Sequence, residues 1–461
     1  MKLRIVILGV VVLIGVGLWL AWRTPPEDEY TPVAGTQKIL IIGIDGIDWD
    51  RMQARFAEGG MPNLERLCRN GAAGILHSSY PFYSPVIWTS MATGKSEEKH
   101  GVHGFRAQWG VGADPGPGGD DGVAGSQLAG SNDREVKAFW NIFSDVGRTV
   151  GVLNWLVTWP AEEVNGYMLS SRTGLHVPMR RFIQDDAEQR DRLRAGVHPP
   201  ELWDTVVGCR RGGETVTEDE IAEFLGSSEI FRDARKAKAT ERLANLYAGD
   251  LTMLNIAERL LEERPTDVTA VYFRGADIIS HMYWKYMEPE SWSKELDPLE
   301  VEALAPVIER YYERMDEMVG QLLEHRGPET TVIVCSDHGF AGHRGYPGFE
   351  GTDAMGLDMH REEGIIILEG PPVDAGVELK GASTIDLTPT VLALAGLPVA
   401  RDMDGRVLIE ALRPEFLDRH PPSFIDTYET GDDDGGGESE SVSSPIDDEI
   451  MEQLRAIGYI N

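Results

Sequence analysis

Apolar runs and amphipathic segments alternate along most of the chain, and this alternation predicts an α/β fold. Uninterrupted apolar runs are typical of parallel strands that are buried on both faces of a sheet. Such runs occur in KILIIGIDG from residue 38, TVGVLNWL from 149, DVTAVYFRGAD from 267 and TTVIVC from 330. Helical patterns with apolar positions three and four apart occur at 61–72, 134–147, 251–264, 304–327 and 386–397. Strands alternating with helices predict a doubly wound, mostly parallel sheet.

The first apolar segment differs from these strands in its length. Residues 5–22 contain no charged side chain and would span about 27 Å as a helix, enough for the hydrocarbon core of a membrane. Bulky residues stand where a signal peptide would need small ones, so we expect an uncleaved transmembrane anchor rather than a removed leader. The basic residues that precede the segment place the N-terminus in the cytoplasm and the bulk of the chain in the periplasm or outside the cell.

The rest of the chain divides into segments of different composition. Residues 176–250 are charged, mostly helical in pattern and without strand signals, which predicts an inserted cap; residues 286–301 could extend it. Residues 430–445 are rich in Gly, Asp, Glu and Ser, as flexible linkers are. We therefore predict an anchor at 1–23, a linker at 24–37, a folded domain at 38–425 with its cap at 176–250, a disordered acidic linker at 426–445 and a C-terminal helix at 446–461.

The net charge of the chain argues against one class of binding partner, nucleic-acid polymers. It is −33 over 461 residues. A field of this sign repels polyanions and argues against a nucleic-acid polymer as partner. It does not exclude a small anion, because a bound metal ion can reverse the local sign.

Three of the apolar runs end in a carboxylate: Asp45, Asp277 and Asp337, the last followed by His338. Ligands of open α/β sheets collect outside the carboxyl ends of parallel strands. If these strands are neighbours, three carboxylates meet in one cleft, where unpaired they would repel one another. One divalent cation would resolve that conflict, and two would resolve it better.

Two further histidines have the spacing of metal ligands. Asp277 and His281 are one helical turn apart and would share a helix face. His360 precedes an apolar strand instead of following one, so this strand must run antiparallel to the others to bring the imidazole to the same edge. Nitrogen and oxygen ligands in such a set suit borderline ions such as zinc.

A candidate nucleophile lies in the hydroxyl-rich segment SYPFYSPVIWTSMATGKSEEKHGVHGF, residues 79–105. Its hydroxyls are those of Ser84, Thr89, Ser90, Thr93 and Ser96. A hydroxyl needs a base or a metal ion to become a good nucleophile. The chain has neither a Ser-His-Asp order nor a GxSxG elbow, so activation by a metal ion is the consistent route.

Together these motifs resemble the alkaline phosphatase superfamily, specifically its type I phosphodiesterase/nucleotide pyrophosphatase branch. The similar pieces are IIGIDG, ATGKSEEKHGV, GADIISH, SDHGF, MHREEGIIILEGP and TIDLTPTVLALAGLPVARDMDG, within residues 38–412, and LRAIGYI is similar to the C-termini of relatives. The resemblance implies a large, mostly parallel central sheet sandwiched between helices.

The resemblance also implies roles for individual residues. The family's nucleophile precedes a TG pair by nine positions, which selects Ser84, with Thr89 as the alternative. Two divalent metal ions are implied, zinc or else manganese. One would be held by Asp45, Ser84, Asp337 and His338, and the other by Asp277, His281 and His360.

Two departures from the family pattern matter. Phosphodiesterase relatives carry an Asn three residues after the nucleophile, and this chain has Ile87. The phosphoryl contact would then come from a backbone N–H, Arg274, Lys95 or His343. The order of residues that sulfatases need to make formylglycine is missing after Ser84, which argues against a sulfatase.

The expected function is a membrane-anchored, metal-dependent phosphoric ester hydrolase, phosphodiesterase or nucleotide pyrophosphatase-like, with a Ser84 phosphoseryl intermediate. The predicted cap would choose a small phosphate-ester substrate. The alternatives are a transferase that moves a phospho-headgroup onto a lipid or glycan, a phosphomonoesterase, and a non-catalytic binding protein that keeps the fold.

Overall fold

A computed structural model describes residues 38–107, 127–175, 187–232, 237–341, 359–429 and 442–459. The chain divides into two units, Met1–Thr36 and Gln37–Asn461, and the second is described here. The predicted anchor and linker at 1–37, most of the acidic linker, and His343 lie outside the described residues. Among the helices of the described part, none is long and apolar enough to cross a membrane.

The second unit is built on a nine-stranded sheet with the order β11-β2-β10-β7-β1-β6-β3-β4-β5. Its strands are β1 (Lys38–Ile44), β2 (Ala72–His77), β3 (Val150–Leu153), β4 (Gly166–Leu169), β5 (Val197–His198), β6 (Val268–Phe273), β7 (Thr330–Cys335), β10 (Glu363–Glu369) and β11 (Val377–Ser383). β7, β1, β6, β3 and β4 run parallel, whereas β10 is antiparallel to both of its neighbours. The prediction of a mostly parallel α/β sheet is confirmed.

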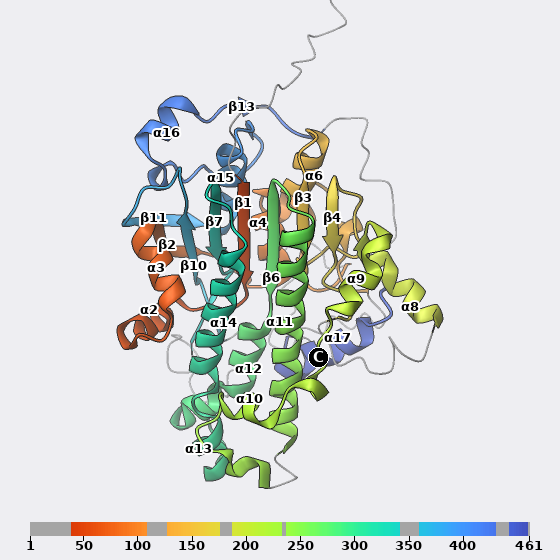
Figure 1. Ribbon diagram of the computed structural model, residues 1–461, viewed down its shortest axis with the longest axis vertical. Helices are drawn as coiled ribbons and strands as arrows, with labels where there is room; N and C mark the ends of the chain where they lie inside the picture. The colour runs from red at the N-terminus through yellow and green to blue at the C-terminus, as the bar shows by residue number, and fades with distance from the viewer. Residues whose placement is uncertain are drawn as a thin grey trace, which may run out of the picture. The chain divides into compact units, whose positions relative to one another are not determined.

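Helices cover both faces of this sheet (Figure 1). One layer holds α2 (Trp49–Glu58), α3 (Pro62–Asn70), α11 (Ala237–Glu263), α12 (Gly275–Met287) and α14 (Val307–Glu324). The opposite layer holds α4 (Ser84–Thr93), α6 (Phe139–Asp145) and α15 (Leu387–Leu394). The remaining helices are α5 (Glu97–His100), α8 (Ala187–Leu193), α9 (Trp203–Gly208), α10 (Glu218–Ala222), α13 (Pro298–Leu304), α16 (Pro414–Arg419) and α17 (Asp447–Ile457). Two-stranded sheets join β8 (Gly339–Phe340) with β9 (His360–Arg361) and β12 (Val399–Ala400) with β13 (Phe424–Ile425).

The central strands are buried on both faces, as their uninterrupted apolar sequences predict. All residues of β1 after Lys38 are buried, and every residue of β6 and β7 is buried. At Gly43 a Cβ atom would lie 2.7 Å from the Trp88 ring. The glycine therefore lets α4 pack directly against the middle of the sheet.

The strand after His360 confirms the predicted reversal of direction. β10 pairs antiparallel with β7 on one side and with β2 on the other. His360, just before this strand, therefore reaches the edge at which β7 ends.

The region predicted as a cap differs from the prediction in two respects. Residues 197–198 form β5, which pairs with β4 at the end of the main sheet, although the sequence shows no strand signal there. The predicted boundary at residue 250 falls within α11, whose 27 residues pack against β6 and α12. Short helices connect these two elements within the described part of the region.

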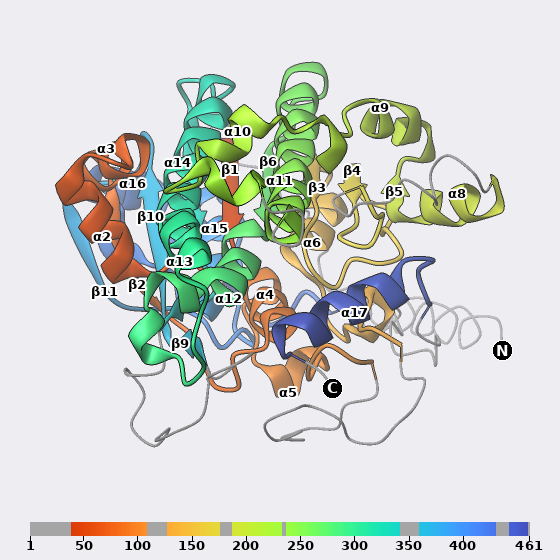
Figure 2. The ribbon, with the colours of Figure 1, turned by 90° about the horizontal axis from the view of Figure 1, so that it is seen from below.

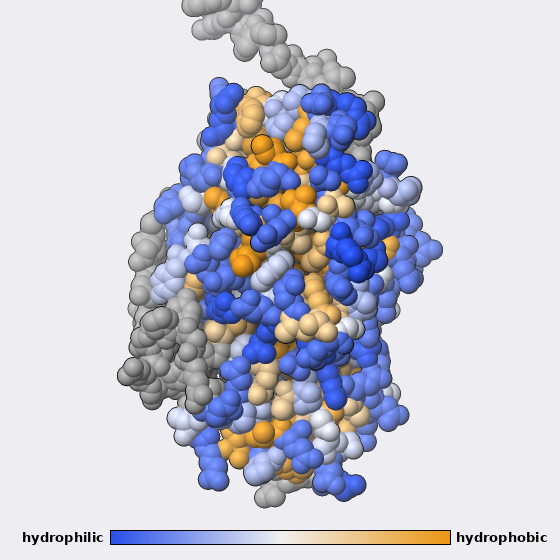
Figure 3. All heavy atoms as spheres, turned by 90° about the vertical axis from the view of Figure 1, so that its left-hand side faces the viewer, coloured by the Kyte–Doolittle hydropathy of each residue, from blue (hydrophilic) through white to orange (hydrophobic). Residues whose placement is uncertain are grey.

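β11 forms the opposite edge of the sheet. Its exposed side chains include Glu378 and Lys380, which are within 3.4 Å of each other. Charged side chains on an edge strand discourage pairing with another chain. Figure 3 looks toward this side, where hydrophilic residues are spread over the face and apolar residues show between them, in its upper part and again near its lower end.

His100 is a buried histidine outside the metal-ligand candidates, and it predicts a pH dependence of stability. The Val102 amide donates to its Nδ1 at 3.1 Å, so the ring proton lies on Nε2, 3.0 Å from the Ser90 hydroxyl. Burial, with a smaller effect of His103, lowers the pKa of His100 to about 3. Below about pH 6.5 the unfolded chain binds a proton that the folded chain does not. The free energy of unfolding should therefore fall by up to about 1.4 kcal/mol per pH unit as pH decreases toward 4.

Denaturant unfolding at several pH values would measure this effect. His100→Gln should show a shallower decrease between pH 6.5 and 4, whatever its stability at neutral pH. His420→Gln at the end of α16 controls for the loss of an imidazole. Identical slopes for His100→Gln and the unmodified protein would contradict the prediction.

Candidate active site

The candidate site lies where three neighbouring parallel strands end. Asp45 follows β1, Asp337 and His338 follow β7, and Asp277 lies in the first turn of α12, just after β6. Since β6, β1 and β7 are adjacent and parallel, their carboxyl ends meet. The predicted convergence of three carboxylates is confirmed.

One cluster contains buried polar atoms that have no hydrogen-bond partner. They are Asp45 Oδ1, Asp337 Oδ2 and His338 Nε2. The imidazole nitrogen lies 3.3 Å from Asp45 Oδ1 and 3.5 Å from Asp337 Oδ2. Buried polar atoms are almost always paired, so three unpaired atoms that face one point indicate a site for a cation.

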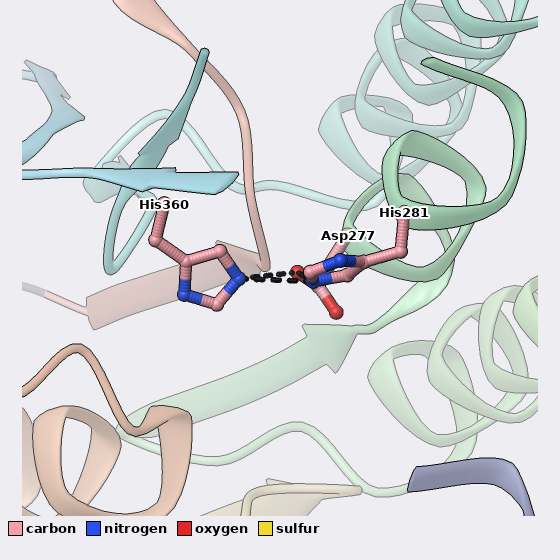
Figure 4. Close-up of side chains that lie close together, drawn as sticks. All are labelled: Asp277, His281 and His360. Atoms are coloured by element: carbon pink, nitrogen blue, oxygen red, sulfur yellow. Dashed lines mark hydrogen bonds and ion pairs between the residues drawn. The ribbon is translucent and has the colours of Figure 1, made fainter. Parts of the chain in front are cut away.

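A second cluster lies beside it and contains Asp277, His281 and His360 (Figure 4). Asp277 Oδ1 lies 3.3 Å from His281 Nε2 and 3.4 Å from His360 Nε2. The two imidazole nitrogens are 3.0 Å apart. Asp277 also belongs with Asp45 and His338 to a group that could hold a metal ion, so one carboxylate is common to both clusters.

Two of the imidazoles are oriented by backbone carbonyls. His338 Nδ1 lies 3.1 Å from the carbonyl of Gly339, and His360 Nδ1 lies 3.1 Å from that of Phe82. A carbonyl only accepts, so in the neutral ring the proton is on Nδ1 and the lone pair of Nε2 faces the cluster. Metal-bound histidines are held in this way in proteins.

Without a bound cation, the charges of the clustered aspartates and histidines do not cancel. Burial and the Asp45 carboxylate raise the pKa of Asp337 well above its usual range. Burial by itself would lower the pKa of His338, but the Asp337 and Asp45 carboxylates raise it to about 10. Burial opposes the ionisation of Asp277, yet His281 holds its pKa well below the usual range. The cluster favours positive charge at its centre, and the residues present fit a metal ion.

Ser84 lies at the same edge of the sheet. It is the first residue of α4, is buried, and lines a cavity of about 90 Å³ together with Asp45 and Asp277. Trp88 of the same helix contacts Trp155 and Tyr272 edge-on, each with ring centroids 4.9 Å apart. These contacts fix the position of α4, and with it the serine, relative to β6.

Thr89, the alternative nucleophile, already uses its hydroxyl in a hydrogen bond. The Thr89 hydroxyl donates to the Pro85 carbonyl at 2.6 Å, one turn earlier in α4. Thr89 is not among the residues that line the cavity. The geometry favours Ser84.

The three side chains predicted to contact the phosphoryl group differ in where they lie. Arg274 lines the cavity, and its Nη2 donates to Gln453 of α17 at 3.1 Å. The prediction for Lys95 is corrected, because its ammonium group pairs with Asp402 and Glu429, each at 2.9 Å, and does not line the cavity. His343 lies outside the described residues.

α17 lines the cavity, whereas the described residues of the predicted cap do not. Apolar side chains from the body and from α17 make up much of its wall: Phe105, Leu128, Leu156, Val157, Ile450, Leu454 and Ile457. None of the described residues at 187–250 or 286–301 lines it. Figure 2 shows α17 crossing the carboxyl-terminal edge of the sheet, beside α12 and α4.

Sequence reasoning missed two residues of this region. The Tyr459 hydroxyl contacts Asp277, His281 and His360 at the second cluster. Arg172, also on the cavity wall, forms a buried ion pair with Asp447. The GYI sequence at the end of the chain was a signal for Tyr459, whereas a single arginine in a loop gives no such signal.

A buried carboxylate–imidazole cluster beside a serine, at the carboxyl ends of a central α/β sheet, is the arrangement of a metal-dependent enzyme. The chain belongs to the type I phosphodiesterase/nucleotide pyrophosphatase family, whose pattern matches residues 39–371. The match supports an enzyme that acts on phosphoric ester bonds. This confirms the resemblance stated from the motifs.

Individual relatives are distant. GPI ethanolamine phosphate transferase 2 of Schizosaccharomyces pombe (strain 972 / ATCC 24843) is 24% identical over 151 residues, which are 31% of this chain and 18% of that protein. Human ectonucleotide pyrophosphatase/phosphodiesterase 5 is 13% identical, with 82% of this chain and 99% of that chain covered and a TM-score of 0.44. A 2-O GAG sulfatase is 12% identical, with coverage of 82% and 74% and a TM-score of 0.46.

Proposed function

We propose that the chain hydrolyses phosphoric esters through a covalent phosphoseryl intermediate at Ser84, with two divalent metal ions. The observation that carries this proposal is the convergence of unpaired carboxylate and imidazole atoms beside the buried Ser84 hydroxyl. Asp45, Asp337, His338 and Ser84 would hold one ion, and Asp277, His281 and His360 the other.

The ions would supply two effects: a lower pKa for the nucleophile's hydroxyl and neutralisation of charge on the phosphoryl oxygens. We propose zinc, since mixed nitrogen and oxygen ligands suit it, with manganese as the alternative.

The residues of the chain would act in sequence. The Ser84 oxygen attacks phosphorus in line, and the bond to the ester oxygen breaks as the alcohol leaves. The proton of the serine hydroxyl leaves with the alcohol. Water then attacks the phosphorylated serine, which still carries the second ester group when the substrate is a diester. This step releases phosphate from a monoester substrate or a phosphomonoester from a diester substrate, and it restores the serine. Ser84 is the first residue of α4, where the positive end of the helix dipole would stabilise the developing negative charge.

Ile87 cannot make the polar contact that relatives make at this position. Two arginines lie on the cavity wall, Arg172 and Arg274. Arg172 is paired with Asp447, so Arg274 would replace this contact by exchanging its bond to Gln453 for one to the phosphoryl oxygen. This contact would help to orient the ester and would add charge stabilisation.

The proposal is tested with the purified full-length chain in detergent. Bis-p-nitrophenyl phosphate and p-nitrophenyl phosphate would be offered with zinc or manganese, followed by a panel of phosphate esters with polar and apolar alcohols. The lining of the cavity favours apolar leaving groups. Activity that survives exhaustive chelation would contradict the metal-dependent mechanism.

A transferase is the second candidate. The similarity to GPI ethanolamine phosphate transferase 2 over 151 residues favours it, and the chemistry differs only in the acceptor that attacks the phosphoserine. Product analysis in the presence of an alcohol acceptor separates the two, because a transferase would yield a new phosphodiester instead of the hydrolysis product.

We also propose that the catalytic domain lies outside the cytoplasm. A single N-terminal membrane helix at residues 1–23 would tether the catalytic domain on the periplasmic or extracellular side. Protease accessibility of the domain in intact and permeabilised cells would test this arrangement.

A further inference from the structure

Tyr459 reaches the second ligand cluster from the end of α17. Its hydroxyl oxygen lies 2.8 Å from His360 Nε2, 2.9 Å from His281 Nε2 and 3.0 Å from Asp277 Oδ1. The ring is buried and packs against Phe105 with centroids 5.0 Å apart. The hydroxyl therefore stands among three groups that face one point.

These four atoms form a nearly regular tetrahedron. Its six edges are the three distances to the hydroxyl, 2.8, 2.9 and 3.0 Å, and the three between the other atoms, 3.0, 3.3 and 3.4 Å. A tetrahedral zinc ion with bonds of about 2.0–2.1 Å has ligand atoms about 3.3–3.4 Å apart. The tetrahedron is only slightly smaller than a coordination shell.

Hydrogen bonding alone does not account for this arrangement. A tyrosine hydroxyl has one proton to donate. It faces both carboxylate oxygens of Asp277, at 3.0 and 3.1 Å, which only accept when ionised. It also faces His360 Nε2, which accepts in the neutral ring because Nδ1 contacts the Phe82 carbonyl. One proton cannot serve three acceptors, whereas a cation at the centre would satisfy them all.

The end of the chain is built to hold the hydroxyl in place. Arg172 donates to both oxygens of Asp447, at 2.9 and 2.7 Å, and to the carbonyls of Leu128 and Ala129. This buried ion pair fixes the start of α17. At its other end Gly458 has φ of 86°, a conformation that favours glycine and turns the chain so that Tyr459 enters the cluster.

We propose that the Tyr459 oxygen is the fourth protein ligand of the metal ion held by Asp277, His281 and His360. The C-terminal segment thereby adds a fourth protein ligand to the three that the motifs supply, and a phosphoryl oxygen would bind as a fifth ligand, as catalytic zinc sites allow. This inference rests on the metal-binding part of the proposed function and goes beyond it, since neither the motifs nor the family assign Tyr459 a role.

The test measures metal binding without turnover. The full-length chain would be stripped of metal and titrated with zinc against a chromophoric chelator. Tyr459→Phe keeps the ring on Phe105 and removes only the oxygen. It should weaken one of the two zinc equivalents at least about tenfold, as loss of a group that supports a metal site does, and leave the other unchanged. Tyr428→Phe is the matched control, because its hydroxyl donates to the Pro398 carbonyl instead.

A spectroscopic measurement distinguishes a ligand from a neighbour. With ferric iron in place of zinc, a tyrosinate ligand gives a charge-transfer band in the visible region, and this band should be absent in Tyr459→Phe and present in Tyr428→Phe. Two tight zinc equivalents in both variants, with no band in any of them, would overturn the role of Tyr459 while leaving the metal site standing. A wild-type chain that binds no zinc would instead overturn the proposed function itself.

Discussion

Replacing Ser84 with alanine should reduce kcat/KM for a phosphodiester substrate by at least about 10³-fold. The substitution removes the only atom that forms the covalent bond to phosphorus in the proposed mechanism. It removes a single oxygen from a buried position and leaves α4 and its contacts with the sheet intact. Steady-state kinetics with bis-p-nitrophenyl phosphate measure the loss, and rapid acid quenching should trap Ser84 esterified with p-nitrophenyl phosphate in the unmodified chain alone.

Thr89→Val is the matched control for this experiment. It lies in the same helix and has a hydroxyl that bonds to the Pro85 carbonyl. Because Thr89 does not line the cavity, kcat/KM should change by less than about threefold, apart from the modest cost of a lost hydrogen bond. If Thr89→Val abolished turnover and Ser84→Ala did not, the alternative nucleophile would be the correct one.

Replacing Asp277 with asparagine should have the second large effect, on metal content. Asp277 belongs to both groups that could hold an ion, so its charge is shared by two sites. We expect the bound metal measured by elemental analysis to fall from two equivalents toward none. His281 belongs to only one of these groups, so His281→Ala should lose one equivalent of bound metal. Activity should fall by at least about 10³-fold in Asp277→Asn, since both ions would act on the reacting phosphoryl group in the proposed mechanism.

Asp316→Asn controls for the loss of a buried carboxylate. Asp316 is buried in α14 and accepts from the backbone of α3, at 2.7 Å from Leu64. Asp316→Asn should have a lower free energy of unfolding but should still bind two equivalents of metal. Two tight equivalents retained by Asp277→Asn would show that the carboxylate does not serve both ions.

The positions of the central site residues could be predicted because each depends on the sequence immediately around it. Each of Asp45, Asp277 and Asp337 comes directly after an apolar strand, and parallel strands bring such ends together. The direction of the strand after His360 followed from the need to bring one imidazole to the same edge. In each case the sequence neighbourhood determines the position of the side chain.

The periphery of the site could not be predicted in this way. Lys95 lies close in sequence to Ser84, but its partners Asp402 and Glu429 are more than three hundred positions away and draw it elsewhere. The docking of α17 includes an ion pair between Arg172 and Asp447, which are far apart in sequence, and the amphipathic pattern of the helix fits any apolar surface. β5 has only two residues, too few for a periodic signal. These features depend on long-range packing that one sequence does not encode locally.

The two sides of the cavity differ in how readily they tolerate amino-acid substitutions. The serine side is anchored to the central sheet through Trp88, Trp155 and Gly43, so a change of size there would displace the reacting atoms. The opposite side is a short surface helix attached at its two ends, whose inward positions Ile450 and Leu454 can vary without disturbing the chemistry. Related enzymes should therefore diverge in the alcohols they release mainly through these helix positions, while the serine side stays nearly invariant.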